Sequence, residues 1–285
     1  MCLGGASAFL NSKKINTIMN KLFYLLLIIS FVSLSGCKGK SQPSDATLVS
    51  DVEERWKSFP LPPVDIQQPY PDEEGSKLYF TIVENPEAFI HEQSRRVLDL
   101  LYFGPEDKFI PKLNHLEYVL DNYDGISACY GGGDMKGIIL SNQYIVSYHQ
   151  EHGAEALIEE NKGVLCHELT HAFQLEPKGI GDYGSSELFR VCIEGVADGV
   201  RVLSGGFPKE SDRPKGGHYM DSYRYTGFFF AWLVNNKDKD FLRKFNLSTQ
   251  DLDPWSFDGA IKYVLGDTYN AEDLWTEYLK AMGDI

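Results

Sequence analysis

Cysteine is scarce in this chain of 285 residues, which contains only five. Three of them, Cys129, Cys166 and Cys192, follow Cys37, and so few cannot form a framework of several disulfides. A folded part of more than about two hundred residues also has enough chain to build a core without such cross-links. The sequence therefore excludes a small disulfide-stapled scaffold and leaves only a single Cys166–Cys192 bridge open.

Positive charge is also in short supply. The chain has 27 lysines and arginines against 41 aspartates and glutamates, which gives a net charge of −14. Such a surface repels the phosphates of nucleic acids and the headgroups of anionic lipids. We therefore expect no nucleic-acid partner, and we expect any membrane attachment to come from acyl chains rather than from a basic patch.

The chain's clearest apolar run, residues 22–34, is too short for a comfortable membrane span. It follows Lys21 and leads through small residues to Cys37. This pattern is typical of a bacterial signal peptide that ends at a lipidation site. We predict a signal peptide over residues 1–36, with Met19 as the true start, and a lipidated Cys37 as the new N-terminus. The alternative is an ordinary signal peptide with an incidental cysteine.

The segment after the signal peptide, residues 37–75, is rich in proline and serine and predicts a tether between the lipid anchor and the folded body. Removal of the signal peptide takes away three lysines and no acid, so the mature net charge is −17. The lipidated form predicts a protein of the bacterial cell envelope, facing the periplasm or the cell surface.

Residues 76–285 form the predicted folded domain, in which strand-like segments come before helical ones. Strand composition marks residues 77–83, 113–120 and 137–148. The glycine-rich stretch 130–134 lacks the lysine of a phosphate-binding loop and predicts a turn between strands. This order predicts an α+β fold, with a small N-terminal mixed sheet, a mainly helical C-terminal part and an active-site cleft between them. The predicted helices span 86–101, 154–174, 187–203, 221–235, 238–245, 256–264 and 271–282.

The strongest functional signal is His167-Glu168-Leu-Thr-His171. Residues four apart share one face of a helix, so both imidazoles can bind the same zinc ion. Glu168 is then placed to accept a proton from a water on that metal. Apolar neighbours on both sides favour a buried helix, in which bare histidines and a glutamate would be costly. We therefore predict one catalytic Zn²⁺ per chain with Glu168 as the general base, rather than a chance match on a surface helix.

Two histidines do not complete a catalytic zinc site, which usually has three protein ligands. One class of zinc proteases has a third histidine shortly after the second, but Gln174 and Pro177 occupy the corresponding positions here. Cys166 adjoins the first histidine but points to the other side of the helix, so we expect it to pack in the core. Asp182 is a competing ligand, although its glycine neighbours favour a polar turn.

Glu194 and Asp198 supply what the motif lacks. They lie four apart on the predicted helix 187–203, and its mostly apolar or small neighbouring residues indicate that both face inward. We predict Glu194 as the third ligand and Asp198 as the carboxylate that holds a ligand imidazole through its other nitrogen. The alternative is an exposed and mildly repulsive acidic pair.

Several segments share one pattern of motifs with a known family. They are 139–145, 163–174, 193–201, 223–233 and 273–278. Together they resemble the plant basic secretory protein family and its bacterial relatives, over about residues 77–280. The resemblance implies a gluzincin-like zinc metallopeptidase fold with a glutamate as third ligand. The name-giving relatives are basic whereas this chain is acidic, so an affinity for polyanions is not carried over.

The resemblance implies peptide-bond hydrolysis by a zinc-activated water. Tyr223 is our candidate to stabilise the oxyanion, because the family pattern keeps a tyrosine there; a packing role is the alternative, and His218 and Tyr219 are weaker candidates. The segment 137–148 is expected to pair with the substrate as an added strand.

We thus predict a secreted, lipid-anchored zinc metallopeptidase that acts as a monomer on a peptide or protein substrate. One alternative is a non-catalytic zinc-containing envelope lipoprotein that binds a protein or glycan ligand. Another is a zinc hydrolase of a different amide bond. Intact Glu168 favours an enzyme, because a purely structural zinc site needs no general base.

Overall fold

The computed structural model describes residues 45–285, so the predicted signal peptide and Cys37 lie outside the described residues. Nine α-helices, one short 3₁₀ helix and a four-stranded sheet make up this part, which confirms the expected α+β class. None of the helices between residues 45 and 285 is both long and apolar enough to cross a membrane.

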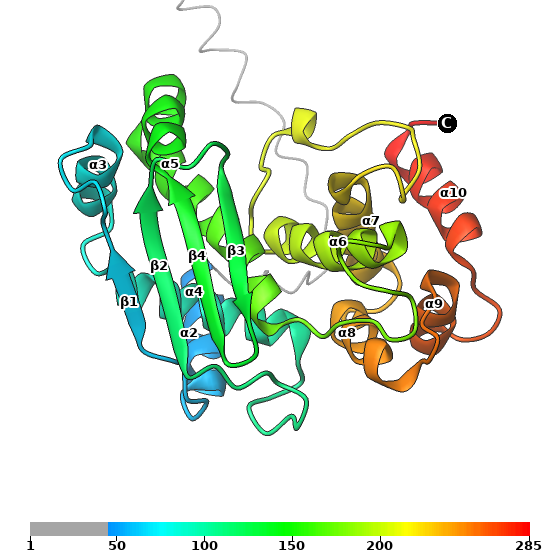
Figure 1. Ribbon diagram of the computed structural model, residues 1–285. Coiled ribbons are helices and arrows are strands. Elements are labelled where there is room, and N and C mark those ends of the chain that lie inside the picture. The colour runs from blue at the N-terminus through cyan, green and yellow to red at the C-terminus, as the bar shows by residue number, and fades with distance from the viewer. Residues whose placement is uncertain (1–44) are drawn as a thin grey trace, which may run out of the picture. The chain divides into compact units, whose positions relative to one another are not determined.

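The four strands form one mixed sheet in the order β1-β2-β4-β3 (Figure 1). β2 pairs in parallel with β1 and β4, and β3 pairs antiparallel with β4. The turn between β3 and β4 lies at Gly133 and Asp134, so the turn predicted over residues 130–134 is confirmed at its end, whereas residues 130–132 belong to β3. β3 therefore lies at a free edge of the described sheet, whereas β4 lies inside it. The bounds are β1 (Val64–Gln67), β2 (His115–Asp121), β3 (Ser127–Gly132) and β4 (Met135–Ser141).

The predicted strand at 137–148 is wrong in its second half. β4 ends at Ser141, whose hydroxyl accepts a hydrogen bond from the backbone N–H of Tyr144 and caps the helix α5 (Asn142–Phe173). A serine cap of this kind satisfies one of the unpaired N–H groups at a helix start. Because β4 is paired on both sides, it also offers no free edge to a substrate.

The predicted tether and first strand are wrong as well. Residues 45–75 include the helix α2 (Asp45–Trp56) and β1, and Trp56 is fully buried. The segment predicted as strand 77–83 belongs to the helix α3 (Glu74–Ile82). Gly75 lets α3 approach α5, since a Cβ there would lie 2.4 Å from the carbonyl oxygen of Asn142. Packing against α5 thus overrides a strand-like local composition.

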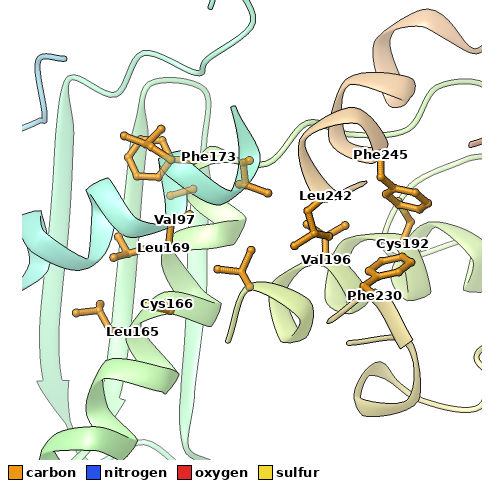
Figure 2. Close-up of a cluster of buried hydrophobic side chains, with 14 of the residues drawn as sticks. Val97, Leu165, Cys166, Leu169, Phe173, Cys192, Val196, Phe230, Leu242 and Phe245 are labelled. Atoms are coloured by element: carbon orange, nitrogen blue, oxygen red, sulfur yellow. The ribbon is translucent and has the colours of Figure 1, made fainter. Parts of the chain in front are cut away.

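The motif helix packs its apolar side into the core. α5 breaks at Gly153, which adopts a left-handed φ of 84°, and its second half follows the predicted helix 154–174. Figure 2 shows Leu165, Cys166 and Leu169 of α5 near Val97 of the helix α4 (Pro86–Leu101). Cys166 is buried and free, as expected for a packing residue, and Cys129 and Cys192 are free as well.

From residue 187 to 285 the chain forms helices and loops without a strand, as predicted. α6 packs between α5 and α7, and Figure 2 shows Val196 of α6 near Phe230 of α7 and Leu242 of α8. α6 and α7 approach closely because Gly195 faces Thr226 and Gly227 faces Asp198. The bounds are α6 (Glu187–Leu203), α7 (Tyr223–Asn236), α8 (Phe241–Asp251), α9 (Phe257–Leu265) and α10 (Ala271–Met282).

Replacing Gly227 by valine should lower the free energy of unfolding by about 1–3 kcal/mol, the usual cost of overpacking a core. A Cβ at this position would lie 2.6 Å from Asp198 Cβ and 2.8 Å from the Asp198 carbonyl carbon, so α6 and α7 must separate. Urea unfolding measures the change. Gly104→Val is the matched control, because nothing lies within 4 Å of a Cβ there. Equal stability of the two variants would show that the helices are not in contact at Gly227.

Candidate metal centre

α5 and α6 bring His167, His171 and Glu194 to one point. The Nε2 atoms of the two histidines lie 3.2 Å apart, and Glu194 Oε2 lies 3.3 Å from His167 Nε2 and 3.6 Å from His171 Nε2. Ligands about 2.0–2.1 Å from a tetrahedral zinc stand roughly 3.3–3.4 Å from one another. Two nitrogens and one carboxylate oxygen at these separations therefore fit a single metal ion of this size, and a group of this kind can hold one.

Asp198, one turn after Glu194, holds the first histidine. Its Oδ1 lies 2.8 Å from His167 Nδ1, so the Nδ1–H of a neutral imidazole can donate to it. That tautomer leaves the lone pair of Nε2 directed at Glu194 and the neighbouring histidine. The structure thus brings the four predicted residues of the centre together, with Asp198 behind the ligand atoms rather than among them.

Gln174 contacts the second histidine at its Nδ1 atom, as Asp198 contacts the first. Its carboxamide nitrogen lies 2.7 Å from His171 Nδ1. For His171 to bind a metal through Nε2, its Nδ1–H must donate a hydrogen bond, which the carboxamide oxygen accepts after a half-turn of the amide. Sequence reasoning treated Gln174 only as the place of a missing histidine and overlooked this contact.

The charges around His167 favour a cation at the centre. Burial opposes its protonation, but hydrogen bonds to Asp198 and Glu194 outweigh this and raise the pKa of His167 to about 10. Burial also disfavours the charged form of Glu194, yet the two histidines hold the pKa of that carboxyl well below its ordinary value. A divalent cation at the three donor atoms would neutralise these carboxylates in place of a proton on His167.

Glu168 lies beside the two histidines and Glu194, but its hydrogen bond is to a residue of the sheet. It is 5% exposed, and its Oε1 accepts a hydrogen bond of 2.5 Å from the hydroxyl of Ser127, the first residue of β3. Its carboxylate makes no hydrogen bond to the histidines within residues 45–285, so it is separate from the three donor atoms that meet at the centre. Ser127 carried no recognisable motif, because its position follows from the β3–α5 packing rather than from sequence spacing.

Two hollows meet at these residues, one of about 480 Å³ and one of about 340 Å³. Ser127, His167, Glu168 and Tyr223 line both. The larger hollow continues past His171 along α5, and the smaller one continues toward the loop after α6. An extended molecule that occupies both hollows would pass directly over His167 and Glu168.

Tyr223 and Tyr183 line the hollows at the centre. Tyr223, the first residue of α7, is 39% exposed and lines both hollows. Tyr183 donates a 2.8 Å hydrogen bond to Glu194 Oε1, and sequence reasoning missed it because it lies in an irregular loop. The weaker candidates His218 and Tyr219 contact Glu272 instead and line neither hollow.

Asp182, the competing ligand, is an exposed turn residue. Its Oδ1 accepts hydrogen bonds from the backbone N–H groups of Gly184 and Ser185 and from the Ser185 hydroxyl. These bonds hold the pKa of the Asp182 carboxyl below its ordinary value. The expected role of Asp182 in a polar turn is therefore confirmed by its contacts.

A comparison with protein families agrees with the geometry. The family model BSP, described as a peptidase of plants and bacteria, matches residues 62–278. No curated protein and no solved structure matches the chain. The family match begins before β1 and ends in α10, so it covers the whole sheet and all residues of the candidate centre, and it confirms the resemblance drawn from the motifs.

Proposed function

This chain belongs to the BSP family of plant and bacterial peptidases, and from that premise we propose that it is a zinc-dependent metallopeptidase. The observation that carries the proposal is the meeting of two imidazole nitrogens and one carboxylate oxygen at the spacing of a tetrahedral metal site, with a separate carboxylate, Glu168, beside them. A metal held only for structure needs no such free carboxylate.

His167, His171 and Glu194 would hold the zinc ion, with Asp198 and Gln174 orienting the two imidazoles. When bound, zinc polarises a carbonyl and lowers the pKa of a water molecule. Glu168 accepts the proton of the attacking water and later delivers it to the leaving amine. The Ser127 hydroxyl fixes one oxygen of Glu168, which leaves the other free for this transfer.

Oxyanion stabilisation falls to a tyrosine hydroxyl in this proposal. Tyr223 remains our candidate because it lines both hollows beside His167. Tyr183 is a second hydroxyl in the same place, although its hydrogen bond to Glu194 gives it the additional role of positioning a ligand. A donor that is already in place costs no reorganisation when charge develops on the substrate oxygen.

The substrate is proposed to be a peptide or protein bound along β3. This strand has a free edge within the described sheet, and its first residue, Ser127, contacts the general base. Extended peptides commonly bind by adding a strand to such an edge. We thus propose that the substrate pairs with β3, in place of the segment 137–148 expected from the sequence. The zincin-like cleft would lie between β3 and the helices α5 and α6.

The location of the protein is proposed from the sequence pattern at its N-terminus. The apolar run before Cys37 supports export, lipidation and attachment to the bacterial cell envelope. The net charge of −14 argues against nucleic acid as a partner, and we propose that the chain acts as a monomer.

Removing the metal should abolish activity reversibly. We expect the purified full chain to contain about one zinc per molecule, and a chelator to reduce cleavage of a broad peptide library to background. Adding zinc back should restore cleavage, because the ligands belong to a folded scaffold of helices. Elemental analysis and a fluorogenic peptide assay measure the two quantities. Unchanged cleavage by metal-free protein would refute the proposal, and bound zinc without cleavage of any peptide would favour the non-catalytic binding protein.

A further inference from the structure

The smaller hollow beside the metal centre contains an arginine without an anionic partner. Arg224, the second residue of α7, is exposed and lines this hollow together with Glu168. Within residues 45–285 its guanidinium makes no ion pair, and it lies over the ring of Phe207, whose centroid is 4.4 Å from the guanidinium carbon. An unpaired cation at this place is unusual in a chain with a net charge of −14.

Phe207 forms a fixed platform for this arginine. The guanidinium carbon of Arg201 lies 3.9 Å from the same ring centroid, and Arg201 is buried and ion-paired with Glu160 at 2.7 Å. Phe207 adopts a left-handed φ of 55°, which a bulky residue retains only where its surroundings impose it. Glu160 neutralises Arg201, so of the two arginines that line the smaller hollow, Arg224 is the one whose charge remains available to a ligand.

We propose that Arg224 on its Phe207 platform binds a substrate carboxylate next to the scissile bond, an inference that rests on the proposed peptidase function. The planar guanidinium donates two parallel hydrogen bonds to a carboxylate, and stacking on an aromatic ring keeps its edge free for them. A hollow of about 340 Å³ has room for an acidic side chain or for the C-terminus of a peptide. The rest of the acidic surface repels anions, so one carboxylate in an otherwise neutral peptide is the ligand that fits best.

The direction of β3 indicates which side of the bond carries this carboxylate. Ile126, just before β3, lines only the smaller hollow; Ser127 lines both, and Cys129 lines only the larger one. An antiparallel strand pair is slightly more stable per residue than a parallel one. A peptide antiparallel to β3 runs from the larger hollow to the smaller, so the residues after the scissile bond meet Arg224.

The test compares matched peptides with the full chain supplied with zinc. Each pair carries glutamate or glutamine at one of the two positions after the scissile bond, with the C-terminus amidated, and a further pair ends there with a free or an amidated C-terminus. We expect the carboxylate to raise kcat/KM about tenfold to hundredfold. The amidated pairs identify a side-chain carboxylate, and the last pair identifies a C-terminal one.

Variants of Arg224 assign the preference to this residue. Arg224→Gln should remove most of it, Arg224→Lys should retain part of it, and Arg224→Glu should reverse it in favour of lysine. Lys280→Gln is the control, because it removes one positive charge from an exposed side chain on α10, which lines neither hollow. Equal kcat/KM for glutamate and glutamine peptides, or a preference that survives Arg224→Gln, would overturn the assignment, as would an acidic preference before the scissile bond.

Measuring peptide binding without cleavage tests the carboxylate site independently of the proposed peptidase function. Fluorescence anisotropy with labelled peptides and the zinc-loaded Glu168→Gln protein measures Kd for each pair without cleavage. If no peptide is cleaved by the wild type but the glutamate peptide binds at least about tenfold more tightly through Arg224, the carboxylate site stands and the peptidase proposal fails. If peptides are cleaved and neither kcat/KM nor Kd depends on the carboxylate, the carboxylate site fails alone.

Discussion

Replacing Glu168 by glutamine should lower kcat/KM for a peptide substrate by about 10²–10⁴-fold while the protein keeps its zinc, since general acid–base catalysis contributes a factor of this size. Glutamine has the shape of glutamate and can still accept the hydrogen bond from Ser127, but it cannot take up a proton from water. The carboxylate of Glu168 is not one of the three donors that meet at the centre, so the metal content should stay near one per chain.

Steady-state kinetics and elemental analysis on the same samples check this expectation. Glu187→Gln is the control, because Glu187 is an exposed acid in the first turn of α6 and lines neither hollow. It should match the wild type in both measurements. If Glu168→Gln keeps full activity, another group accepts the proton. A variant that loses both activity and zinc would instead place Glu168 among the residues that hold the metal.

The helices were the part of the fold most accessible from sequence. The predicted bounds of α4, α6 and α10 agree with the structure at both ends. Asn85, Ser186 and Asn270 each cap one of these helices by accepting a hydrogen bond from a backbone N–H three residues later. Such caps are local signals, and a periodic apolar face then fixes the length of the helix.

The strands were harder to predict, because their partners lie far away in sequence. β1 is four residues long and pairs with β2, some fifty positions later, so nothing local distinguishes it from an extended tether. β3 contains glycines and exposes half of its residues, which hides the alternation of a strand. The residues of α3 have a strand-like composition but form a helix that packs against α5, where Gly75 allows the close approach.

The residues of the candidate centre also fall into two groups, those that helix periodicity predicts and those that only the fold brings together. His167, His171, Glu194 and Asp198 lie on two helices at spacings of four, and that periodicity places each pair on one face. Ser127, Tyr183 and Arg224 come from a strand start, a loop and a helix start, and only the assembled fold brings them to the same hollows. The sequence therefore specifies the candidate metal ligands, whereas the residues proposed to position Glu168 and to bind the substrate depend on tertiary packing.

The two carboxylates of α6 should differ sharply when each is changed to its amide. Glu194→Gln should weaken zinc binding by about 10²–10³-fold, because apparent zinc-binding free energies of roughly 10–16 kcal/mol are shared among about four ligands. Asp198→Asn should weaken it only about 10–100-fold, the usual cost of losing a partner behind a ligand imidazole. Glu194 Oε2 lies within 3.6 Å of both Nε2 atoms, whereas Asp198 contacts only His167 Nδ1.

Competition with a chromophoric chelator measures these affinities, and peptide cleavage at saturating zinc shows whether the occupied centre still works. Asp182→Asn is the matched control, since Asp182 is an exposed acid whose carboxylate serves a turn, and its affinity should equal that of the wild type. Equal losses in the Glu194 and Asp198 variants would contradict the assignment of one ligand and one orienting residue. A large loss of zinc affinity in Asp182→Asn with none in Glu194→Gln would make Asp182 the third ligand. The metal would then lie at a different position relative to Glu168.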